Sequence, residues 1–346
     1  PLRADVRVVK CYGELERGHL TDADLVFSAG GDGTFLRTAS FIQDLELAPL
    51  LCGINTDPFR SEGFLCAGYG RWARDARALG TQEVNDAEVR RQVERLLARL
   101  CAEDFVCVMR QRVRVTVEPV ARRGRSGSID SVAGESDATL GAGQSDVGDA
   151  VCAGRSSTDT GCAEGGGGGA GGSVQLLALN DVLVAEYEAQ NVSYYELCFR
   201  PASEAASDTP HVEKQKSSGL LIATGTGSTA WNRTTATVQP DTVKRILELA
   251  GMQEPVDPNL CQRVAEEFSN SLVFDPSSQL MRFQVREPIV NGVFTCEHPH
   301  DFARSIVIRP RSSDMRIFVD GQLRAPLPPN HVARFAIRPE DALKVI

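Results

Sequence analysis

One segment divides this sequence more sharply than any other feature. Residues 121–173 are mostly Gly, Ser, Asp and Ala, and they hold about half of the chain's 31 glycines. Such a composition cannot bury enough apolar surface to offset the entropy lost on folding. The flanking residues 106–117 and 174–187 are rich in residues that favour strands. We therefore expect a disordered insertion between two strands of one domain, rather than a linker between two domains.

The residues before this insertion alternate between strand and helix patterns. Apolar runs at 24–29 and 49–54 predict strands, and a helical stretch at 35–42 lies between them. Residues 88–101 carry apolar side chains at helical spacing, and the valines of residues 6–9 predict a further strand near the start. Strand and helix in alternation favour a parallel α/β layer, so the first half is predicted to be Rossmann-like.

The residues after the insertion predict consecutive strands. These are expected at 176–186, 193–200, 219–224, 281–285, 305–309, 317–319 and 333–337, with helices near 242–250 and 258–271. The second half is therefore predicted to be β-rich and β-sandwich-like. We expect an α/β domain at 1–103, a β-rich domain at 104–328, and a C-terminal segment at 329–346 that returns to the first domain.

Charge and hydropathy exclude some classes of function. The 346 residues include 37 Lys and Arg against 46 Asp and Glu, a formal net charge of -9. A general binder of nucleic acid or of acidic membranes needs a basic surface, so neither partner is expected. A bound Mg²⁺ or a few local cations would still allow a phosphorylated ligand. No apolar run reaches the ~18 residues of a membrane span.

The cysteines and the first residue bear on where the protein resides. The 10 cysteines include no C-x-x-C pair, which favours a reducing compartment over a disulfide framework. The chain begins with Pro1 and enters an apolar pattern almost at once, so we expect a fragment that lacks any targeting peptide. Cys296, His298 and His300 lie close together, but Pro299 between them favours a loop, and no metal site is assigned.

The first motif that indicates chemistry is Gly30-Gly31-Asp32-Gly33-Thr34, between a predicted strand and a predicted helix. Glycines allow close approach of a ligand, and a helix N-terminus suits phosphate. A carboxylate in the same loop could accept the proton of an attacking hydroxyl during phosphoryl transfer. The alternative is a tight turn with Asp32 as the helix N-cap. The motif lacks the spacing of a Walker A loop and of a Rossmann dinucleotide fingerprint.

The second motif, at residues 224–232, reads Thr-Gly-Thr-Gly-Ser-Thr-Ala-Trp-Asn and follows an apolar strand. Its hydroxyls and backbone donors suit ribose or phosphate, and Trp231 suits a base. The alternative is a polar turn in which Trp231 is a core anchor. Because each half contributes one such loop, the sequence predicts a site at the interface of the two domains.

Several motifs together resemble the NAD kinase family, in the order in which that family has them. They are residues 30–34, Gly53-Ile54-Asn55-Thr56, Glu62-Gly63-Phe64-Leu65, Asn180-Asp181, residues 226–231 and Asp320-Gly321-Gln322. Residues 55–58, 60–63, 193–196, 214–219 and 286–289 are similar to the animal mitochondrial branch. The resemblance covers nearly the whole chain except the insertion. Without it, Asp320-Gly321-Gln322 reads only as a hairpin turn.

The resemblance implies an enzyme that uses ATP with Mg²⁺ to phosphorylate the adenosine-ribose 2′-hydroxyl of NAD⁺, giving NADP⁺. It implies that Asp32 is the catalytic base. The residues that it implies for binding are Gly31, Gly33, Thr34, Asn55, Phe64, Asn180, Asp181, Ser218, Thr226, Gly227, Ser228, Thr229, Ala230, Trp231 and Thr234. Three of these depart from family patterns: Asp181 stands for Glu, Ser218 for a bacterial Asp, and Trp231 for a frequent Tyr.

The resemblance also implies a mitochondrial homodimer, with NAD⁺ and ATP as partners. Two other functions stay open on the residues alone. A lipid kinase of the diacylglycerol or sphingosine type would share Gly30 to Thr34, and a non-catalytic NAD(P)-binding protein would share the dinucleotide loop. NADH beside NAD⁺, and polyphosphate in place of ATP, are also open.

Overall fold

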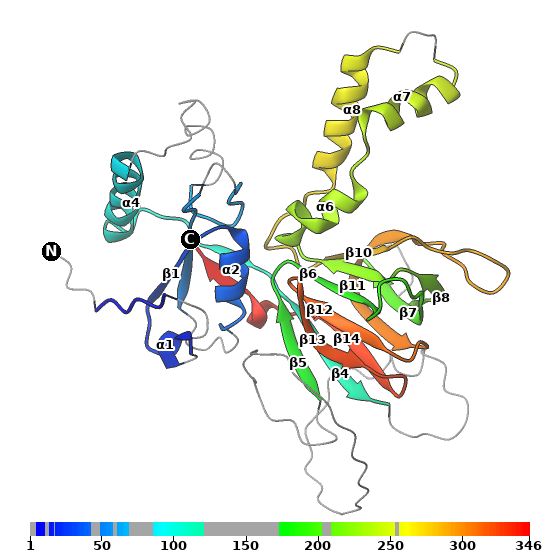
Figure 1. The fold of residues 1–346 in the computed structure, drawn as a ribbon, viewed down its shortest axis with the longest axis horizontal. Coiled ribbons are helices and arrows are strands. Elements are labelled where there is room, and N and C mark those ends of the chain that lie inside the picture. Colours follow the sequence, from blue (N-terminus) through cyan, green and yellow to red (C-terminus); the bar gives the residue numbers. More distant parts are fainter. Residues whose placement is uncertain are drawn as a thin grey trace, which may run out of the picture.

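The computed structural model describes residues 5–10, 14–16, 18–42, 49–57, 61–68, 86–120, 173–202, 209–252 and 256–346. The expected insertion at 121–173 lies outside these residues except for Ser173. The described strands form a 4-stranded sheet and an 11-stranded sheet, with the C-terminus at the smaller one (Figure 1). Within the described residues, no helix combines the length and the hydropathy that a transmembrane segment requires.

The small sheet is mixed. In pairing order its strands are β1 (Leu25–Ala29), β2 (Leu50–Ile54), β15 (Leu343–Val345) and β3 (Val108–Arg110). The first three run parallel, and β3 is antiparallel to β15. The other elements described in this half are α1 (Gly18–Thr21), α2 (Asp32–Ala39), α4 (Asp86–Cys101) and the 3-10 helix η3 (Pro339–Asp341). The chain therefore comes back to its first half at its end.

Helix α2 covers the small sheet with one face. Phe35, Thr38 and Ala39 are buried at positions three and four apart, which is the spacing of one helix face. Phe35 packs in a core with Leu51 of β2 and Leu343 of β15. This packing fixes the start of α2, and with it the position of Asp32, against the ends of β1 and β2.

Every described strand pair of the large sheet is antiparallel, and the sheet curls around a single core. Its strands are β4 (Val113–Pro119), β5 (Val174–Ala178), β6 (Asp181–Glu186), β7 (Ser193–Pro201), β8 (His211–Ser217), β9 (Leu220–Ala223), β10 (Met281–Val285), β11 (His300–Pro310), β12 (Met315–Val319), β13 (Gln322–Leu327) and β14 (His331–Ile337). The pairing runs β13-β12-β6-β9-β10-β11-β14-β4-β5, and β7 joins β8 to β11. Every one of these strands except β8 contributes to the same buried cluster.

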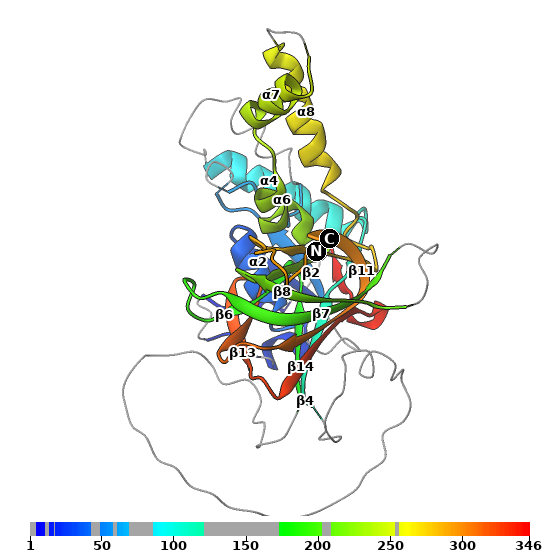
Figure 2. The ribbon, with the colours of Figure 1, turned by 90° about the vertical axis from the view of Figure 1, so that its right-hand side faces the viewer.

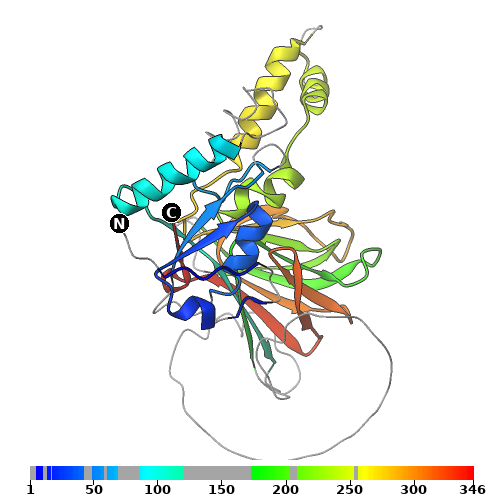
Figure 3. The same cartoon turned by 60° about the vertical axis from the view of Figure 1, so that its left-hand side comes forward.

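A helical hairpin projects from the large sheet (Figures 1, 2 and 3). It consists of α7 (Pro240–Leu249) and α8 (Pro258–Ser271), and it follows the 3-10 helix η2 (Gly227–Thr229) and α6 (Trp231–Ala236). Val243 of α7 and Ala265 of α8 lie in its own small core. Proline stands in the first turn of α7 and of α8, where a missing N–H costs nothing. The carboxylate of Asp257 caps α8 by accepting the N–H of Asn259 at 2.9 Å.

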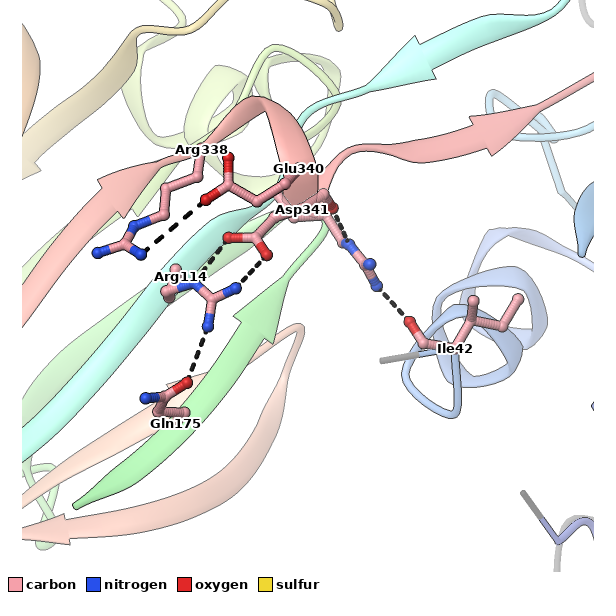
Figure 4. A network of polar contacts seen from close by, with 7 residues as sticks. Ile42, Arg114, Gln175, Arg338, Glu340 and Asp341 are labelled. Carbon is pink, nitrogen blue, oxygen red and sulfur yellow. Dashed lines mark hydrogen bonds and ion pairs between the residues drawn. The ribbon is translucent and has the colours of Figure 1, made fainter. Parts of the chain in front are cut away.

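The buried guanidinium of Arg112 ties the two halves together. Its Nε donates to the carbonyl of Asp341 at 2.6 Å and its Nη1 to the carbonyl of Ile42 at 2.5 Å. Arg114 pairs with the Asp341 carboxylate and donates to Gln175 at 2.8 Å (Figure 4). Burial lowers the pKa of Arg112 to about 10. The end of α2, the start of β4 and η3 are thereby held in one place.

The predicted architecture, an α/β first half and a β-rich second half, is confirmed. The strand predicted at residues 6–9 is wrong: this stretch has no strand, and Val6 and Val8 are 72% and 75% exposed. An apolar pattern without a partner strand does not form a ladder. Strands β8, β13 and β15 were not predicted, and the predicted strand at 176–186 is two strands separated at residues 179–180.

The division into domains at residues 103 and 329 stays a prediction. The described strands show where the chain passes between the sheets. It leaves the small sheet after β3 and enters the large sheet at β4, and it returns between β14 and β15.

Candidate active site

The side chain of Asp32 is fixed at the start of α2. Its Oδ1 accepts the backbone N–H of Leu65 at 2.8 Å, and its Oδ2 accepts that of Phe64 at 3.1 Å. The side chain is half-buried. The alternative that Asp32 caps the helix is wrong, because Gly31 occupies the N-cap position. The carboxylate is therefore oriented by a second loop and serves another purpose than capping.

The glycines on either side of Asp32 differ in whether the local structure requires glycine. Gly30 has φ +154°, and a Cβ there would lie 2.3 Å from Thr34 Oγ1, so the turn itself requires glycine. Gly33 is exposed, and a Cβ there would meet nothing within 4 Å. The first N–H groups of a helix lack partners within the helix and carry its positive dipole end. An anionic group could thus approach the first turn of α2 beside Asp32.

Asn55 shapes the loop that holds Asp32. Its Nδ2 donates to the carbonyl of Ser61 at 2.9 Å, and its Oδ1 accepts the N–H of Asp57 at 3.1 Å. Gly63 has φ +65°, and a Cβ there would lie 2.5 Å from Asn55 Nδ2. The described contacts of the Asn55 amide are within its own loop, so a contact of this residue with a ligand stays a prediction.

Two thiols lie behind the motif. Cys66 Sγ lies 3.6 Å from the carbonyl of Gly30. Burial, and then the charge of Asp32, raise the pKa of Cys66 to about 12, and burial raises that of Cys52 to about 11. Both remain protonated at neutral pH and are therefore poor nucleophiles. We therefore expect the oxygen and nitrogen groups of this site, and not its thiols, to take part in its chemistry.

Arg110 at the end of β3 is hydrogen-bonded to the second glycine-rich loop and lies near Asp32 of the first. Its Nη1 donates to Thr226 Oγ1 at 3.3 Å. Burial lowers the pKa of Arg110, and the nearby charge of Asp32 opposes this change. Its Nε has no partner among the described residues. A cation thus lies between Asp32 and the second motif, and it is a residue that the sequence analysis missed. The only local signal was a pair of arginines, Arg110 and Arg112, at the start of a β-rich stretch.

The second loop is packed tightly, with several hydroxyls turned inward. Thr226 and Ser228 are buried, and Ser228 Oγ donates to the carbonyl of Gly225 at 2.6 Å. A Cβ on Gly227 would lie 2.0 Å from the carbonyl oxygen of Asn180. These contacts explain the small residues by the packing of the protein itself. Ligand contacts of Thr226, Gly227 and Ser228 stay predictions.

The outer part of this loop is open. Thr229 and Ala230 are half-buried, Thr234 is exposed, and Trp231 is 36% exposed. The alternative that Trp231 is a core anchor is therefore wrong. The guanidinium of Arg286 lies 5.1 Å from the centre of the Trp231 ring, and the carbonyl of Arg286 accepts the N–H of Ser218 at 2.9 Å. Arg286 thereby brings Ser218 and Trp231, two predicted residues, to one place.

Asp320 anchors the segment of Asn180 and Asp181. Its Oδ1 accepts the N–H groups of Asn180 at 2.7 Å and Asp181 at 3.2 Å, and its Oδ2 accepts that of Leu179 at 3.0 Å. Burial raises the pKa of Asp320, and these three N–H groups oppose the change. The motif around Asp320 is a hairpin turn, with Gly321 at φ +76°, and also a clamp for the neighbouring strand.

The segment whose backbone Asp320 holds carries two polar side chains, those of Asn180 and Asp181. Burial, and then the charge of Asp320, raise the pKa of Asp181 to about 7. The Oδ1 of Asn180 is buried and has no partner among the described residues. Leu179, directly before them, packs in the core of the small sheet with Phe35 and Leu343. The strand end that bears Asn180 and Asp181 therefore borders the half of the chain that bears Asp32.

A cavity and a cluster of His and Glu side chains lie outside the set of predicted site residues. A cavity of about 400 Å³ opens on the large sheet and is lined by Arg114, Arg200, Arg334 and neighbours, but by none of the predicted residues. One group of three His or Glu side chains in the described part of the chain has possible ligand atoms within 4.8 Å of one another. It comprises Glu213, Glu297 and His298, and it shares no residue with the predicted site.

Known proteins resemble this chain along nearly its whole length. NAD kinase 2, mitochondrial, of Rattus norvegicus is 30% identical over 365 residues, covering 99% of this chain and 72% of the rat protein. NAD kinase 2, mitochondrial, of Homo sapiens is 31% identical over 350 residues, covering 99% of this chain and 69% of the human protein. A solved structure of yeast NADH kinase complexed with NADH has a TM-score of 0.49 and 13% identity, covering 93% of this chain and 61% of that one. No protein-family model matches. On the identity to the rat and human proteins, the chain belongs to the mitochondrial NAD kinase 2 family.

Proposed function

We propose that this protein transfers the γ-phosphoryl group of ATP to the 2′-hydroxyl on the adenosine ribose of NAD⁺, giving NADP⁺ and ADP. Family membership suggests phosphorylation of NAD. One observation carries the finer assignment: the Asp32 carboxylate is held by two backbone N–H groups and lies near the guanidinium of Arg110. A positioned base beside a positioned cation is what phosphoryl transfer to an alcohol requires.

Asp32 acts as the general base in this proposal. A carboxylate has about four acceptor positions, and the N–H groups of Phe64 and Leu65 occupy two of them. The remaining positions accept the proton of the 2′-hydroxyl while its oxygen forms a bond to the γ-phosphorus. The bond from that phosphorus to the β,γ-bridging oxygen breaks, and ADP leaves. A positioned general base contributes roughly 10²–10⁴-fold to a rate.

The phosphate groups are assigned to the first turn of α2 and to Arg110. The backbone of this first turn is accessible beside Gly33, where a Cβ would meet nothing within 4 Å. The proposed phosphate contacts are made by the backbone of Gly31, Gly33 and Thr34. Arg110 offers guanidinium N–H groups next to the Asp32 carboxylate, including an Nε without a described partner. Fixed cations stabilise the charge that spreads over the transferred group.

Mg²⁺ would enter with the triphosphate. No group of three described Asp, Glu, His or Cys side chains lies within the predicted site, so these residues do not form an all-protein cage. Mg²⁺ keeps several waters and is commonly held by substrate phosphates with one or two carboxylates, so the triphosphate would supply its main ligands. The ion supplies neutralisation of the charge on the phosphoryl group.

The dinucleotide is assigned to the segment held by Asp320 and to the exposed end of the second loop. The buried Asn180 Oδ1 is an acceptor without a described partner, which suits a ribose hydroxyl. Asp181, with a pKa of about 7, can donate or accept a hydrogen bond near neutral pH. The exposed ring of Trp231 offers a face to a base. Asn55, Phe64, Ser218, Thr226, Gly227, Ser228, Thr229, Ala230 and Thr234 complete the proposed binding set.

A direct assay separates this proposal from its rivals. The protein is incubated with ATP, Mg²⁺ and NAD⁺, and NADP⁺ is measured with an NADP⁺-specific dehydrogenase while ADP is measured separately. The proposal expects equal amounts of NADP⁺ and ADP. A non-catalytic dinucleotide-binding protein would bind NAD⁺ and form neither product. A lipid kinase would form ADP only when diacylglycerol or sphingosine is supplied.

Localisation and assembly are part of the same proposal. The relatives are named as mitochondrial proteins, and we propose the same compartment for this one. We also propose a homodimer, which light scattering coupled to size-exclusion chromatography tests through the molar mass. A mass near the chain's own 37.4 kDa would contradict the dimer.

A further inference from the structure

A cluster of two glutamates and one histidine lies at the edge of the large sheet, apart from the proposed active site. Strand β8 pairs only with β7 among the described strands. The segment that leads into β11 passes beside it and brings Glu297 and His298 to Glu213 of β8. One possible ligand atom from each of these three residues lies within 4.8 Å of the other two.

The buried member of the cluster is firmly oriented. Glu213 is 6% exposed. Its Oε1 lies 2.6 Å from His298 Nδ1, and its Oε2 accepts a hydrogen bond from Gln215 Nε2 at 2.6 Å. Hydrogen bonds that orient a ligating carboxylate are typical of metal sites. The Glu213 carboxylate is therefore presented toward His298 and does not rotate freely.

The imidazole is also supported. The His298 ring lies 4.8 Å, centre to centre, from the ring of His211 and 5.2 Å from that of Phe199. Cys296 is two residues before His298, but its sulfur is not among the ligand atoms that lie within 4.8 Å of one another. The donor set is thus one imidazole nitrogen and two carboxylates.

The charge of the cluster is compatible with a bound cation. Two carboxylates within this distance repel each other, and His298 provides a positive charge only when it is protonated. A divalent ion balances both carboxylates and leaves the imidazole neutral. Imidazole and carboxylate ligands suit Zn²⁺, with metal–ligand distances of about 2.0–2.2 Å and a water in a fourth position.

We propose that Glu213, Glu297 and His298 bind a divalent transition-metal ion, with Zn²⁺ as the ion that fits these donors best. The ion would fasten the loop before β11 to the edge strand. The other end of that loop is already attached, because the N–H of Ile289 donates to the carbonyl of Lys216 on β8 at 2.8 Å. The proposal does not depend on the kinase activity.

The test uses the full chain, stripped of metal with a chelator, and Zn²⁺ in calorimetric titration. One ion is expected to bind each chain at this cluster. Glu297 is exposed, so Glu297→Gln should leave the fold intact and weaken binding by at least roughly tenfold, as loss of even an outer-shell partner does. His298→Gln should do the same. The matched control is His300→Gln, an exposed histidine two residues along, which should bind as the parent does.

A second measurement excludes zinc bound by the cysteines. Co²⁺ replaces Zn²⁺, and its visible spectrum is recorded for the same variants. The proposal expects a spectrum without the intense thiolate band, lost in Glu297→Gln and His298→Gln and kept in His300→Gln. A thiolate band, equal affinity in all variants, or no saturable binding by the parent would each overturn it.

Discussion

The Asp320 carboxylate accepts the backbone N–H of Asn180 at 2.7 Å, although the two residues are 140 positions apart in the chain. The same carboxylate receives the N–H groups of Leu179 and Asp181. One buried side chain thereby fixes the backbone of the segment that we assign to dinucleotide binding. This arrangement makes Asp320 a positioning residue, with a role that differs from that of Asp32.

Asp320→Asn should reduce both stability and NAD⁺ binding. An amide has one acceptor oxygen where the carboxylate has two, so at least one buried N–H loses its partner at a cost of about 1–3 kcal/mol. Urea denaturation measures the stability, and KM for NAD⁺ against kcat measures the positioning. We expect KM to rise more than kcat falls. Asp24→Asn, an exposed aspartate before β1, is the control. Equal stability and equal KM would show that the clamp is dispensable.

Arg110 should matter for the rate. Arg110→Met removes the cation near Asp32 and the hydrogen bond to Thr226, and kcat should fall by roughly 10²–10³-fold, as for loss of one fixed donor in other active sites. Arg110→Lys keeps the charge and should recover part of this loss. Steady-state kinetics with ATP and NAD⁺ measures the change. Arg99→Met, at the exposed end of α4, controls for loss of an arginine. A kcat unchanged in Arg110→Met would remove Arg110 from the proposed site.

Asp181 should make stability depend on pH. Its pKa rises from 3.8 to about 7 on folding, so the folded protein holds a proton that the unfolded chain releases between these values. The stability that this proton gives the folded state is fully present below about pH 4. It is lost as the pH rises to about 7, and the free energy of unfolding then falls by up to about 1.4 kcal/mol per pH unit. Urea denaturation of the parent and of Asp181→Asn across this range measures it. The free energy of unfolding of Asp181→Asn should decrease less with pH than that of the parent. The same slope against pH in both proteins would contradict the account.

Trp231 should contribute to binding and little to stability. Because its ring is 36% exposed and contacts the Arg286 guanidinium, Trp231→Ala leaves no large cavity. Because we assign this ring to stacking on a base of the dinucleotide, removal of the ring should weaken NAD⁺ binding by about 1–3 kcal/mol. Trp231→Tyr should keep most of the affinity. Calorimetric titration with NAD⁺, beside a thermal melt, separates the two effects. A large drop in melting temperature with unchanged affinity would instead make Trp231 structural.

Local sequence patterns predicted the elements that carry the first motif. The strand before Gly30, the helix after it and the acid between them are all encoded within a few residues. What holds Asp32 was not predictable, because the N–H groups of Phe64 and Leu65 lie 32 and 33 positions further along. Their approach depends on the parallel pairing of β1 with β2, which no local pattern specifies.

Arg110 escaped prediction for a similar reason. Its partner Thr226 is 116 positions away, and a lone arginine near the start of a strand resembles a surface charge. Strand β8 escaped because it lies at an edge and has a single apolar residue, Val212, among polar neighbours. Asp320 was singled out only through family resemblance, since its turn gives no sign that the carboxylate reaches another strand.

The base assignment of Asp32 is tested most directly by the turnover of Asp32→Asn in NADP⁺ formation, measured together with its NAD⁺ affinity. An amide keeps the size of the side chain but accepts no proton, so we expect kcat to fall by roughly 10²–10⁴-fold while the fold and NAD⁺ binding stay close to the parent. A variant with intact NAD⁺ binding and near-parental turnover would contradict the account.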